Sequence, residues 1–297
     1  MMVLVIGDAL VDQCVWVKKM PARGSDETIL SSAEHSGGSA LNTSFRLSGL
    51  GVLTGFCGCI GDDESGRNLL KKMHDSGIDT SLVRTEPGST GHTITIIDGQ
   101  GERTMLSDRG LSARSLILTD EIREKIRQIR LLCLSGYWLI DPAQTEFVIQ
   151  CAAYARSQGV TVMLDPCPTI RTVEPATVRR ILDVIDIFAP NRDELAAVTG
   201  TDDIEKSFST LETVIPALLL KMGAKGSMLQ LSTNFPKPAV PGSSRRFRAP
   251  APHVTPINTT GAGDVYNAAF IASYLSGKTP EEWLRDANAC AAEWVAG

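Results

Sequence analysis

Short apolar runs alternate with amphipathic segments along most of this chain of 297 residues. The runs predict buried strands, and the segments between them predict helices. Strands separated by helices of this length form parallel βαβ units, so the pattern predicts an α/β fold, a three-layer α/β/α sandwich with a central, mostly parallel sheet. Such sheets bind ligands outside the carboxyl ends of their strands. Strands are expected at 3–6, 53–60, 131–134, 160–164, 185–188, 217–221 and 227–231, and helices at 40–50, 65–73, 145–156 and 175–182.

Two stretches of alternating polar and apolar residues break this rhythm. Residues 15–35 and 90–107 show the alternation that is typical of antiparallel strands. We therefore expect one domain over residues 1–297, in which a small antiparallel sheet from about 13–36 and 90–108 covers the main sheet as a discontinuous lid. A later segment is predicted to be a loop or an edge strand because it is crowded with prolines, at positions 236, 238, 241, 250, 252 and 256.

The composition argues against several classes of protein. With 43% hydrophobic and 21% charged residues, the chain is not expected to be disordered. No apolar run approaches the roughly 18 residues that span a bilayer, and the run at 3–6 is too short for a secretion signal. The 29 Lys and Arg residues against 34 Asp and Glu give a net charge of −5, which argues against nucleic acid as a partner. We therefore expect a cytoplasmic protein that binds neither nucleic acid nor membrane.

The seven cysteines form an odd set, and none of them falls in a CxxC pair. His74 and His92 have no neighbour at metal-ligand spacing. A zinc site or a disulfide framework is therefore not expected, and most of the cysteines are predicted to be small buried side chains in a reducing compartment.

A glycine-rich turn opens directly into a predicted helix at 258–264. Small residues at 261–263 leave backbone N–H groups uncovered, and the helix dipole adds partial positive charge, so this end suits a phosphoryl group with developing charge. A carboxylate beside such a site would repel phosphate unless it had a task. Asp264 fits the task of taking a proton from an attacking hydroxyl. The alternative is that Asp264 only caps the helix above a tight turn.

A second glycine turn, Gly37-Gly38, precedes the predicted helix that contains Asn42. A polar amide in the first turn of a helix, beside bare backbone, can hydrogen-bond a polyhydroxylated ligand. A plain capping turn is the alternative. Asp12 follows the first predicted strand, so it either reaches the same crevice or is an ordinary loop residue.

Together these motifs resemble the PfkB or ribokinase-like family of carbohydrate and nucleoside kinases over nearly the whole chain. Each motif alone is only moderately specific, whereas five of them in family order, on a matching α/β rhythm, are strong evidence. The matching motifs are, in order, Gly7-Asp8 with Asp12, 37–42 with its continuation at 58–66, Asn191 with Glu194, 221–226 and 258–270.

The resemblance implies an ATP-dependent phosphotransferase that moves the γ-phosphate to a hydroxyl of a small sugar or sugar acid. Asp264 would be the catalytic base, and the anion hole over the γ-phosphate would consist of Gly261, Ala262 and Gly263. Acceptor hydroxyls would be bound by Asp12, Gly38 and Asn42. ATP would be bound by Asn191 at its phosphates and, in the adenosine pocket, by Lys221, Gly223, Gly226 and Asn288. Mg²⁺ would be held through water by Glu194.

Three features differ from the family pattern. Asn258 stands where many members have Asp, next to a monovalent-cation site in the ribokinase branch, so K⁺ activation is left open. Cys167 replaces the amide of a family Asp-Pro-Asn segment. Relatives usually continue beyond the helix that carries Asn288 with a further strand and helix, whereas this sequence ends at Gly297. We therefore expect either a truncated sequence or a reduced wall of the nucleotide site.

The acceptor is the least constrained part of the prediction. Ser39 stands where the phosphofructokinase-like branch tends to have Lys, which favours an unphosphorylated pentose, hexose or sugar acid. Arg103 and Arg109 either meet an acidic sugar or are surface residues. A catalytically inactive sugar- or nucleotide-sensing protein is one alternative, and an exposed edge of the lid would favour a homodimer. The nearest rival is a nucleoside kinase of the same fold, whose base would need an aromatic or apolar slot, which Trp16, Tyr137 or Trp138 could supply.

Overall fold

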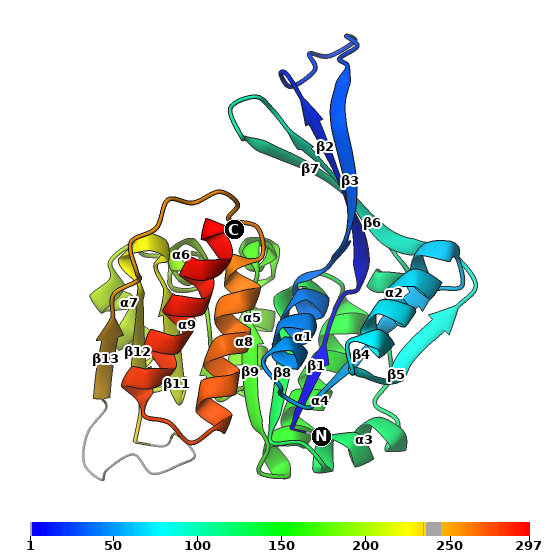
Figure 1. Ribbon diagram of the computed structural model, residues 1–297. Helices are drawn as coiled ribbons and strands as arrows, with labels where there is room; N and C mark the ends of the chain where they lie inside the picture. Colours follow the sequence, from blue (N-terminus) through cyan, green and yellow to red (C-terminus); the bar gives the residue numbers. More distant parts are fainter. Residues whose placement is uncertain (1, 234, 236–244) are drawn as a thin grey trace.

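The computed structural model describes residues 2–233, 235 and 245–297, and a nine-stranded sheet forms its centre (Figure 1). The strand order is β13-β12-β11-β10-β9-β8-β1-β4-β5. From β11 to β5 every neighbouring pair is parallel, whereas β12 runs antiparallel to both of its neighbours. The strands are β1 (Val3–Ile6), β4 (Thr54–Gly61), β5 (Asp79–Glu86), β8 (Leu131–Ser135), β9 (Thr161–Asp165), β10 (Ile187–Phe188), β11 (Ala217–Lys221), β12 (Ser227–Leu231) and β13 (Arg245–Ala249).

Helices cover both faces of this sheet. One face packs against α1 (Ser39–Gly49), α2 (Glu64–Asp75), α8 (Ala262–Leu275) and α9 (Pro280–Ala296). The other packs against α3 (Asp120–Arg127), α4 (Pro142–Ser157), α5 (Pro175–Leu182), α6 (Arg192–Thr199) and α7 (Ile204–Leu211). Val3 and Val5 point to the first layer and Leu4 and Ile6 to the second, because successive strand residues face opposite sides. The predicted three-layer sandwich is confirmed.

A separate four-stranded sheet projects from the carboxyl ends of the main strands (Figure 1). It consists of β2 (Leu10–Val17), β3 (Ile29–Gly37), β6 (Thr90–Ile97) and β7 (Arg103–Gly110), in the order β3-β2-β6-β7. The outer pairs are antiparallel, as predicted, and the central pair β2–β6 is parallel. β2 and β6 both begin at the main body and run outward. β3 runs back beside β2, and β7 runs back beside β6. The two outgoing strands therefore meet side by side in the same direction.

Asp63 ties this small sheet to the main body. Its carboxylate caps α2 by accepting the N–H of Gly66 at 2.8 Å. The same carboxylate accepts the backbone N–H of Thr90 at 2.8 Å and the Thr90 hydroxyl at 2.6 Å, at the first residue of β6. The Gly61 N–H donates to Thr90 Oγ1 at 2.9 Å. The segment 58–66, which resembles a family signature in the sequence, is therefore the joint that holds the root of β6.

The proline-crowded segment continues the sheet at its edge. Pro236, Pro238 and Pro241 lie outside the described residues. β13 is an edge strand, and Pro250, Pro252 and Pro256 lie in the loop that follows it, so the described part confirms the predicted edge strand and loop. Within the described ranges, every helix is too short or too polar to cross a membrane.

Candidate active site

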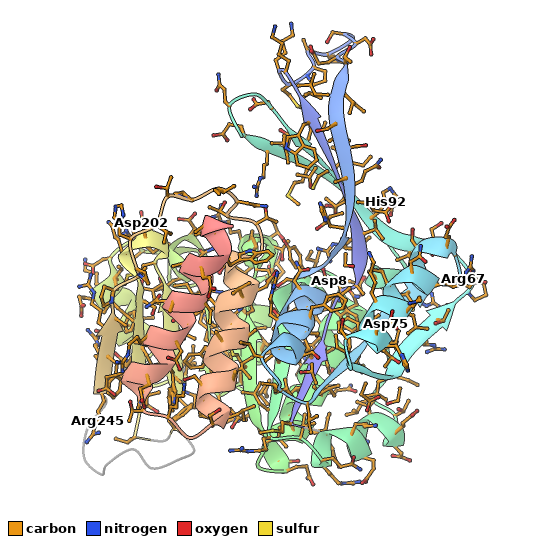
Figure 2. The ribbon with its side chains drawn as sticks, viewed as in Figure 1. Asp8, Arg67, Asp75, His92, Asp202 and Arg245 are labelled. Atoms are coloured by element: carbon orange, nitrogen blue, oxygen red, sulfur yellow. The ribbon has the colours of Figure 1, made fainter. Side chains whose placement is uncertain are left out.

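A cleft of about 770 Å³ opens where the small sheet meets the carboxyl ends of the main strands. Figure 2 labels Asp8 at this junction, between β1 and β2. The fold brings every predicted site residue to this one cleft, although the residues come from opposite ends of the chain. They are Asp12, Gly38, Asn42, Asn191, Glu194, Lys221, Gly223, Gly226, Gly261, Ala262, Gly263, Asp264 and Asn288.

Asp264 lines the cleft from the first turn of α8 and is 8% exposed. The Ser39 hydroxyl donates to its Oδ1 at 2.7 Å and the Asn42 amide donates to its Oδ2 at 3.0 Å. Burial, together with the charge of Asp165, raises the pKa of Asp264 to about 7. Gly261 is the N-cap residue of α8 and no side chain caps this helix, so Asp264 is not the cap. A carboxyl that titrates near neutrality in a cleft is suited to accept a proton.

The turn before Asp264 presents backbone donors to the cleft. In the part of the chain that the structure describes, the N–H groups of Gly263 and Asp264 donate to no protein acceptor, as is normal for the first turn of a helix. Gly261 has a φ of +73°, which favours glycine, and the turn is held from outside because the Trp294 indole N–H donates to the carbonyl of Thr260 at 2.7 Å. This end of α8 therefore has uncovered backbone donors of the kind that suit an anion.

Lys221, which the family resemblance assigns to the adenosine pocket, pairs with the carboxylate at the end of β9. Its Nζ lies 2.8 Å from Asp165 Oδ1 and donates to Asn267 Oδ1 at 3.4 Å. β9, which ends at Asp165, lies on one side of β11, whereas the residues around Gly226 lie on the other. Burial acts to lower the pKa of Lys221, but the charges of Asp165 and Glu194 outweigh it and raise that pKa. Lys221 is therefore a charged ammonium that lines the cleft beside Asp165.

The Gly37-Gly38 turn allows two carboxyl groups to approach the first turn of α1. A Cβ on Gly37 would lie 2.4 Å from Asp12 Cγ, and one on Gly38 would lie 2.4 Å from the carbonyl oxygen of Asp8. Burial and the charge of Asp8 raise the pKa of Asp12 to about 6. Burial also raises the pKa of Asp8, which accepts a hydrogen bond from Ser135 Oγ at 3.1 Å. The turn is thus required for close packing of Asp8 and Asp12, and more than a cap.

The small sheet turns one face of β7 toward the cleft, with Met105, Ser107 and Arg109 in its lining. The Arg109 guanidinium lies 4.5 Å from the ring centroid of Tyr137, and its buried Nη1 has no hydrogen-bond partner within the described residues. Arg103, at the start of β7, donates to Asn258 Oδ1 at 2.8 Å and also to the Thr260 hydroxyl. The small sheet therefore contacts the loop that leads into the anion-binding turn.

Asn191 and Glu194 form a capping box at the start of α6. Glu194 N–H donates to Asn191 Oδ1 at 2.9 Å, and Glu194 Oε2 accepts the Asn191 N–H at 2.8 Å. Burial raises the pKa of Glu194, which is 4% exposed. Among the described residues no three His, Cys, Asp or Glu side chains are grouped to hold a metal ion. A hydrated Mg²⁺ with few direct protein ligands fits this donor set, whereas a fully protein-ligated ion does not.

The far end of the cleft has mostly apolar walls, and its polar side chains include Asn288 and His253. Asn288 Nδ2 donates to Ser227 Oγ at 3.0 Å and to the Ala249 carbonyl at 3.1 Å, so it fastens α9 to β12 and β13. A Cβ on Gly226 would lie 2.0 Å from the Ala249 oxygen, so this glycine is required by packing. The wall is completed by Ala251, Pro252, Val254, Pro256, Ala291, Ala292 and Val295. Such a slot suits a flat, mostly apolar ring.

Three further residues belong to the site although they are not among the predicted site residues. Ser39 and Asp165 line the cleft, and Asn267 accepts from Lys221 behind it. Asp165 directly follows a predicted strand at 160–164, and the carboxyl ends of parallel strands lie at one edge of the sheet. Its place in the cleft could therefore have been predicted from the sequence. Asn267 lies in the middle of a helix, where no sequence signal distinguishes it.

The sequence pattern of the pfkB family carbohydrate kinases matches residues 1–296. The chain belongs to this family. The PfkB kinase is 28% identical to "Ribokinase" of Arabidopsis thaliana, over 97% of this chain and 74% of that protein. It is 30% identical to "ATP-dependent ribose-1-phosphate kinase" of Halopiger xanaduensis, over 98% of this chain and 90% of that protein. It is 28% identical to "5-dehydro-2-deoxygluconokinase" of Listeria monocytogenes, over 89% of this chain and 82% of that protein.

Solved structures agree with the family assignment. The structure of Arabidopsis thaliana ribokinase complexed with ribose and ATP superposes on this PfkB kinase with a TM-score of 0.83. The two share 26% identity, and the match covers 99% of this chain and 92% of that one. The structure of ribokinase from Thermotoga maritima superposes with a TM-score of 0.84 at 23% identity. The match covers 100% of this chain and 93% of that one. The ribokinase-like fold predicted from the sequence is therefore confirmed, and the chain is a carbohydrate kinase.

The raised pKa of Asp264 predicts a pH dependence. A base works in its deprotonated form, so kcat/KM should rise with pH through a limb near 7 and level off above it. Asp264→Asn should lower kcat by about 10² to 10⁴-fold and remove the limb, while ATP still binds. Steady-state kinetics from pH 5.5 to about 9 measure both effects. Asp202→Asn, at an exposed carboxylate outside the cleft, is the control. Normal turnover by Asp264→Asn would rule out the base.

Gly261 and Gly263 should respond differently to alanine. A Cβ on Gly263 would meet only Lys221 Nζ, at 3.8 Å, and its φ is not positive, so Gly263→Ala should change the free energy of unfolding by less than about 1 kcal/mol. The methyl group would crowd the open N–H groups, and kcat should fall by about 10-fold or more. Gly261→Ala should cost roughly 1–2 kcal/mol because of its positive φ. Urea unfolding and initial rates test this pair. Full activity in Gly263→Ala would refute the anion-hole role.

Proposed function

We propose that this kinase transfers the γ-phosphate of ATP to a hydroxyl group of a small sugar or sugar acid, with Asp264 as the catalytic base. The observation that carries the proposal is the position of Asp264. Its carboxyl faces the cleft, titrates near neutrality and stands directly beside backbone N–H groups that donate to no described protein acceptor. A proton acceptor and an anion site at one point are what an in-line transfer to an alcohol requires.

Different residues of the cleft would bind the acceptor, the nucleotide and the transferring phosphate. Ser39 and Asn42 fix both carboxyl oxygens of Asp264, which orients the base. In the turn Gly261-Ala262-Gly263, the open N–H groups of Gly263 and Asp264 would stabilise charge on the transferring group, whereas the Ala262 N–H already donates to the Thr259 carbonyl at 3.3 Å. Asp12, Gly38 and Asn42 would bind acceptor hydroxyls, and Asn191, Gly223, Gly226 and Asn288 would position the nucleotide. Mg²⁺, held through water by Glu194, would neutralise phosphate charge when bound with ATP.

The relatives and the lining favour a sugar over a nucleoside. The relatives named above include a ribokinase, a ribose-1-phosphate kinase and a dehydro-deoxygluconokinase, which all act on small sugar derivatives by name. Of the three aromatic residues considered for a base slot, only Tyr137 lines the cleft. Its ring faces Arg109, and Trp138 is fully buried in the core. A non-catalytic sensor would have no need for a carboxyl group poised near neutrality.

The small sheet is proposed to act as a lid. Its inner face lines the cleft, and Arg103 links it to Asn258 and Thr260. Closure of such a lid excludes water, which limits hydrolysis of ATP without an acceptor. Asn258 brings no negative charge to its position and its oxygen already accepts from Arg103 and from the Thr260 N–H. No role for K⁺ is therefore proposed.

Assembly and location extend the proposal. β3 and β7 are the edge strands of the small sheet, and on β3 Ile29 and Leu30 are 56% and 66% exposed. These features support a homodimer through the lid, and light scattering that gives a monomer would contradict it. All seven cysteines are free thiols, which suits the cytoplasm, and fractionation of cells tests that location.

The acceptor class can be tested by ATP consumption over a panel of pentoses, hexoses, sugar acids and nucleosides. We expect acceptor-dependent release of ADP with at least one sugar or sugar acid, and no such release from Asp264→Asn. Asn42→Ala should weaken acceptor binding more than ATP binding, measured by calorimetry, because Asn42 is proposed to bind acceptor hydroxyls beside the base. Turnover with nucleosides alone would favour the rival kinase, and no turnover with any acceptor would overturn the proposal.

Arg103 offers a test of the lid. Arg103→Ala removes both side-chain contacts with the loop at Asn258 and Thr260, so water should enter more readily. We expect acceptor-independent ATP hydrolysis to rise about 3- to 10-fold relative to phosphoryl transfer, together with a higher KM for the acceptor. Arg245→Ala, on an exposed arginine of the distant edge strand β13, is the matched control. An unchanged ratio of hydrolysis to transfer in Arg103→Ala would argue against a closing role.

A further inference from the structure

The cleft holds an excess of acidic side chains. Its acidic lining residues are Asp8, Asp12, Asp165, Glu194 and Asp264, whereas Arg109 and Lys221 are the Arg and Lys side chains of the described lining. Arg109 lies on the small sheet against Tyr137. A nucleotide triphosphate adds several negative charges to this site, and those charges need a positive partner where the transfer occurs. Of these two cations, Lys221 is the one that contacts the first turns of α8.

The position of Lys221 is defined by α8. Its Nζ would lie 3.8 Å from a Cβ on Gly263, and it donates to Asn267 Oδ1 at 3.4 Å. Gly263 and Asn267 are four residues apart, so they lie on one face of the helix, one turn above the other. The ammonium group therefore lies alongside the first turn of α8, beside the open amides of the anion-binding turn.

The hydrogen bonds of Lys221 leave capacity for a ligand. An ammonium group has three N–H donors. Within the described residues Nζ has two acceptors, Asp165 Oδ1 at 2.8 Å and Asn267 Oδ1 at the longer distance of 3.4 Å. Ser39 Oγ donates its one proton to Asp264 Oδ1 at 2.7 Å, and the same Oγ lies 3.4 Å from the other oxygen of Asp165. Lys221 and the base are thus held in one network through Asp165 and Ser39.

We propose that Lys221 is a catalytic residue that binds the γ-phosphoryl group during transfer, and that Asp165 is a positioning residue that holds the ammonium beside the anion-binding turn. The inference rests on the proposed function and assigns Lys221 to the phosphate instead of the adenosine pocket. In the transfer, the bond between the γ-phosphorus and the bridging oxygen of ADP breaks, and a bond to the acceptor oxygen forms. Asp264 takes the hydroxyl proton, ADP leaves with the electron pair, and Lys221 keeps its protons.

A purely structural ion pair is the competing explanation. A buried pair contributes little net stability, since desolvation of both charges offsets their attraction. An apolar pair would serve packing equally well at this depth. A charged pair at the end of β9 and β11, directly beside an anion site, is explained when the cation has a partner beyond Asp165.

Differential binding of nucleotides tests the proposal without any acceptor. Calorimetry with MgATP and MgADP would be run on the natural chain and on Lys221→Met and Lys221→Arg. A contact with the γ-phosphate predicts that Lys221→Met weakens MgATP by about 10- to 100-fold and MgADP by less than about 3-fold, with partial recovery in Lys221→Arg. Lys72→Met, on an exposed lysine of α2, controls for loss of one charge. With an acceptor, kcat should fall by about 10² to 10³-fold in Lys221→Met.

The outcomes separate the explanations. Equal weakening of MgATP and MgADP would return Lys221 to the adenosine pocket, and unchanged affinities would leave only a structural pair; either result overturns the proposal. Lys221→Met leaves Asp165 buried without its partner, so the double variant Lys221→Met/Asp165→Asn is measured as well, and it should show the same selective loss for MgATP. If the acceptor panel fails while this selectivity holds, the proposed function falls and the phosphate contact stands.

Discussion

The burial of Asp264 is the constraint on which the site depends. A carboxylate that is withdrawn from water needs hydrogen bonds, and here they come from Ser39 and Asn42 in the first turns of α1. The helix that carries the carboxyl group and the helix that supplies its donors therefore have to start at the same edge of the sheet. The order of β1, β8 and β9, whose carboxyl ends meet there, provides that edge.

The glycine turns serve this arrangement in two ways. At Gly37 and Gly38 the absence of Cβ is required by the protein itself, because Asp12 and Asp8 lie against the backbone. Gly263 meets no such requirement, since a methyl group there would make only an ordinary contact. Glycine turns that look alike in the sequence therefore meet different physical requirements. One turn packs two acidic groups close together, and the other keeps amides open toward the cleft.

Sequence reasoning recovered the parts of this design that repeat or cluster along the chain. The strand rhythm predicted the sandwich, and the glycine motifs placed Asp264, Asn42 and their neighbours correctly in one cleft. It missed the pairing of Lys221 with Asp165, which joins residues 56 positions apart. Such a pair depends on which strands become neighbours, and local patterns do not encode that order. The parallel pairing of β2 with β6 was missed for the same reason.

The burial that raises the pKa of Asp264 costs the protein stability and also makes this carboxylate a stronger base. A carboxyl group whose pKa is raised in the folded state binds its proton more tightly there than in the unfolded chain. Between the ordinary pKa of 3.8 and the value of about 7 at Asp264, the free energy of unfolding therefore falls as pH rises. Asp12, with its pKa raised to about 6, adds to this loss. Loss of stability at a functional site is common. Here the burial that disfavours the carboxylate also makes Asp264 basic enough to take a proton near neutrality.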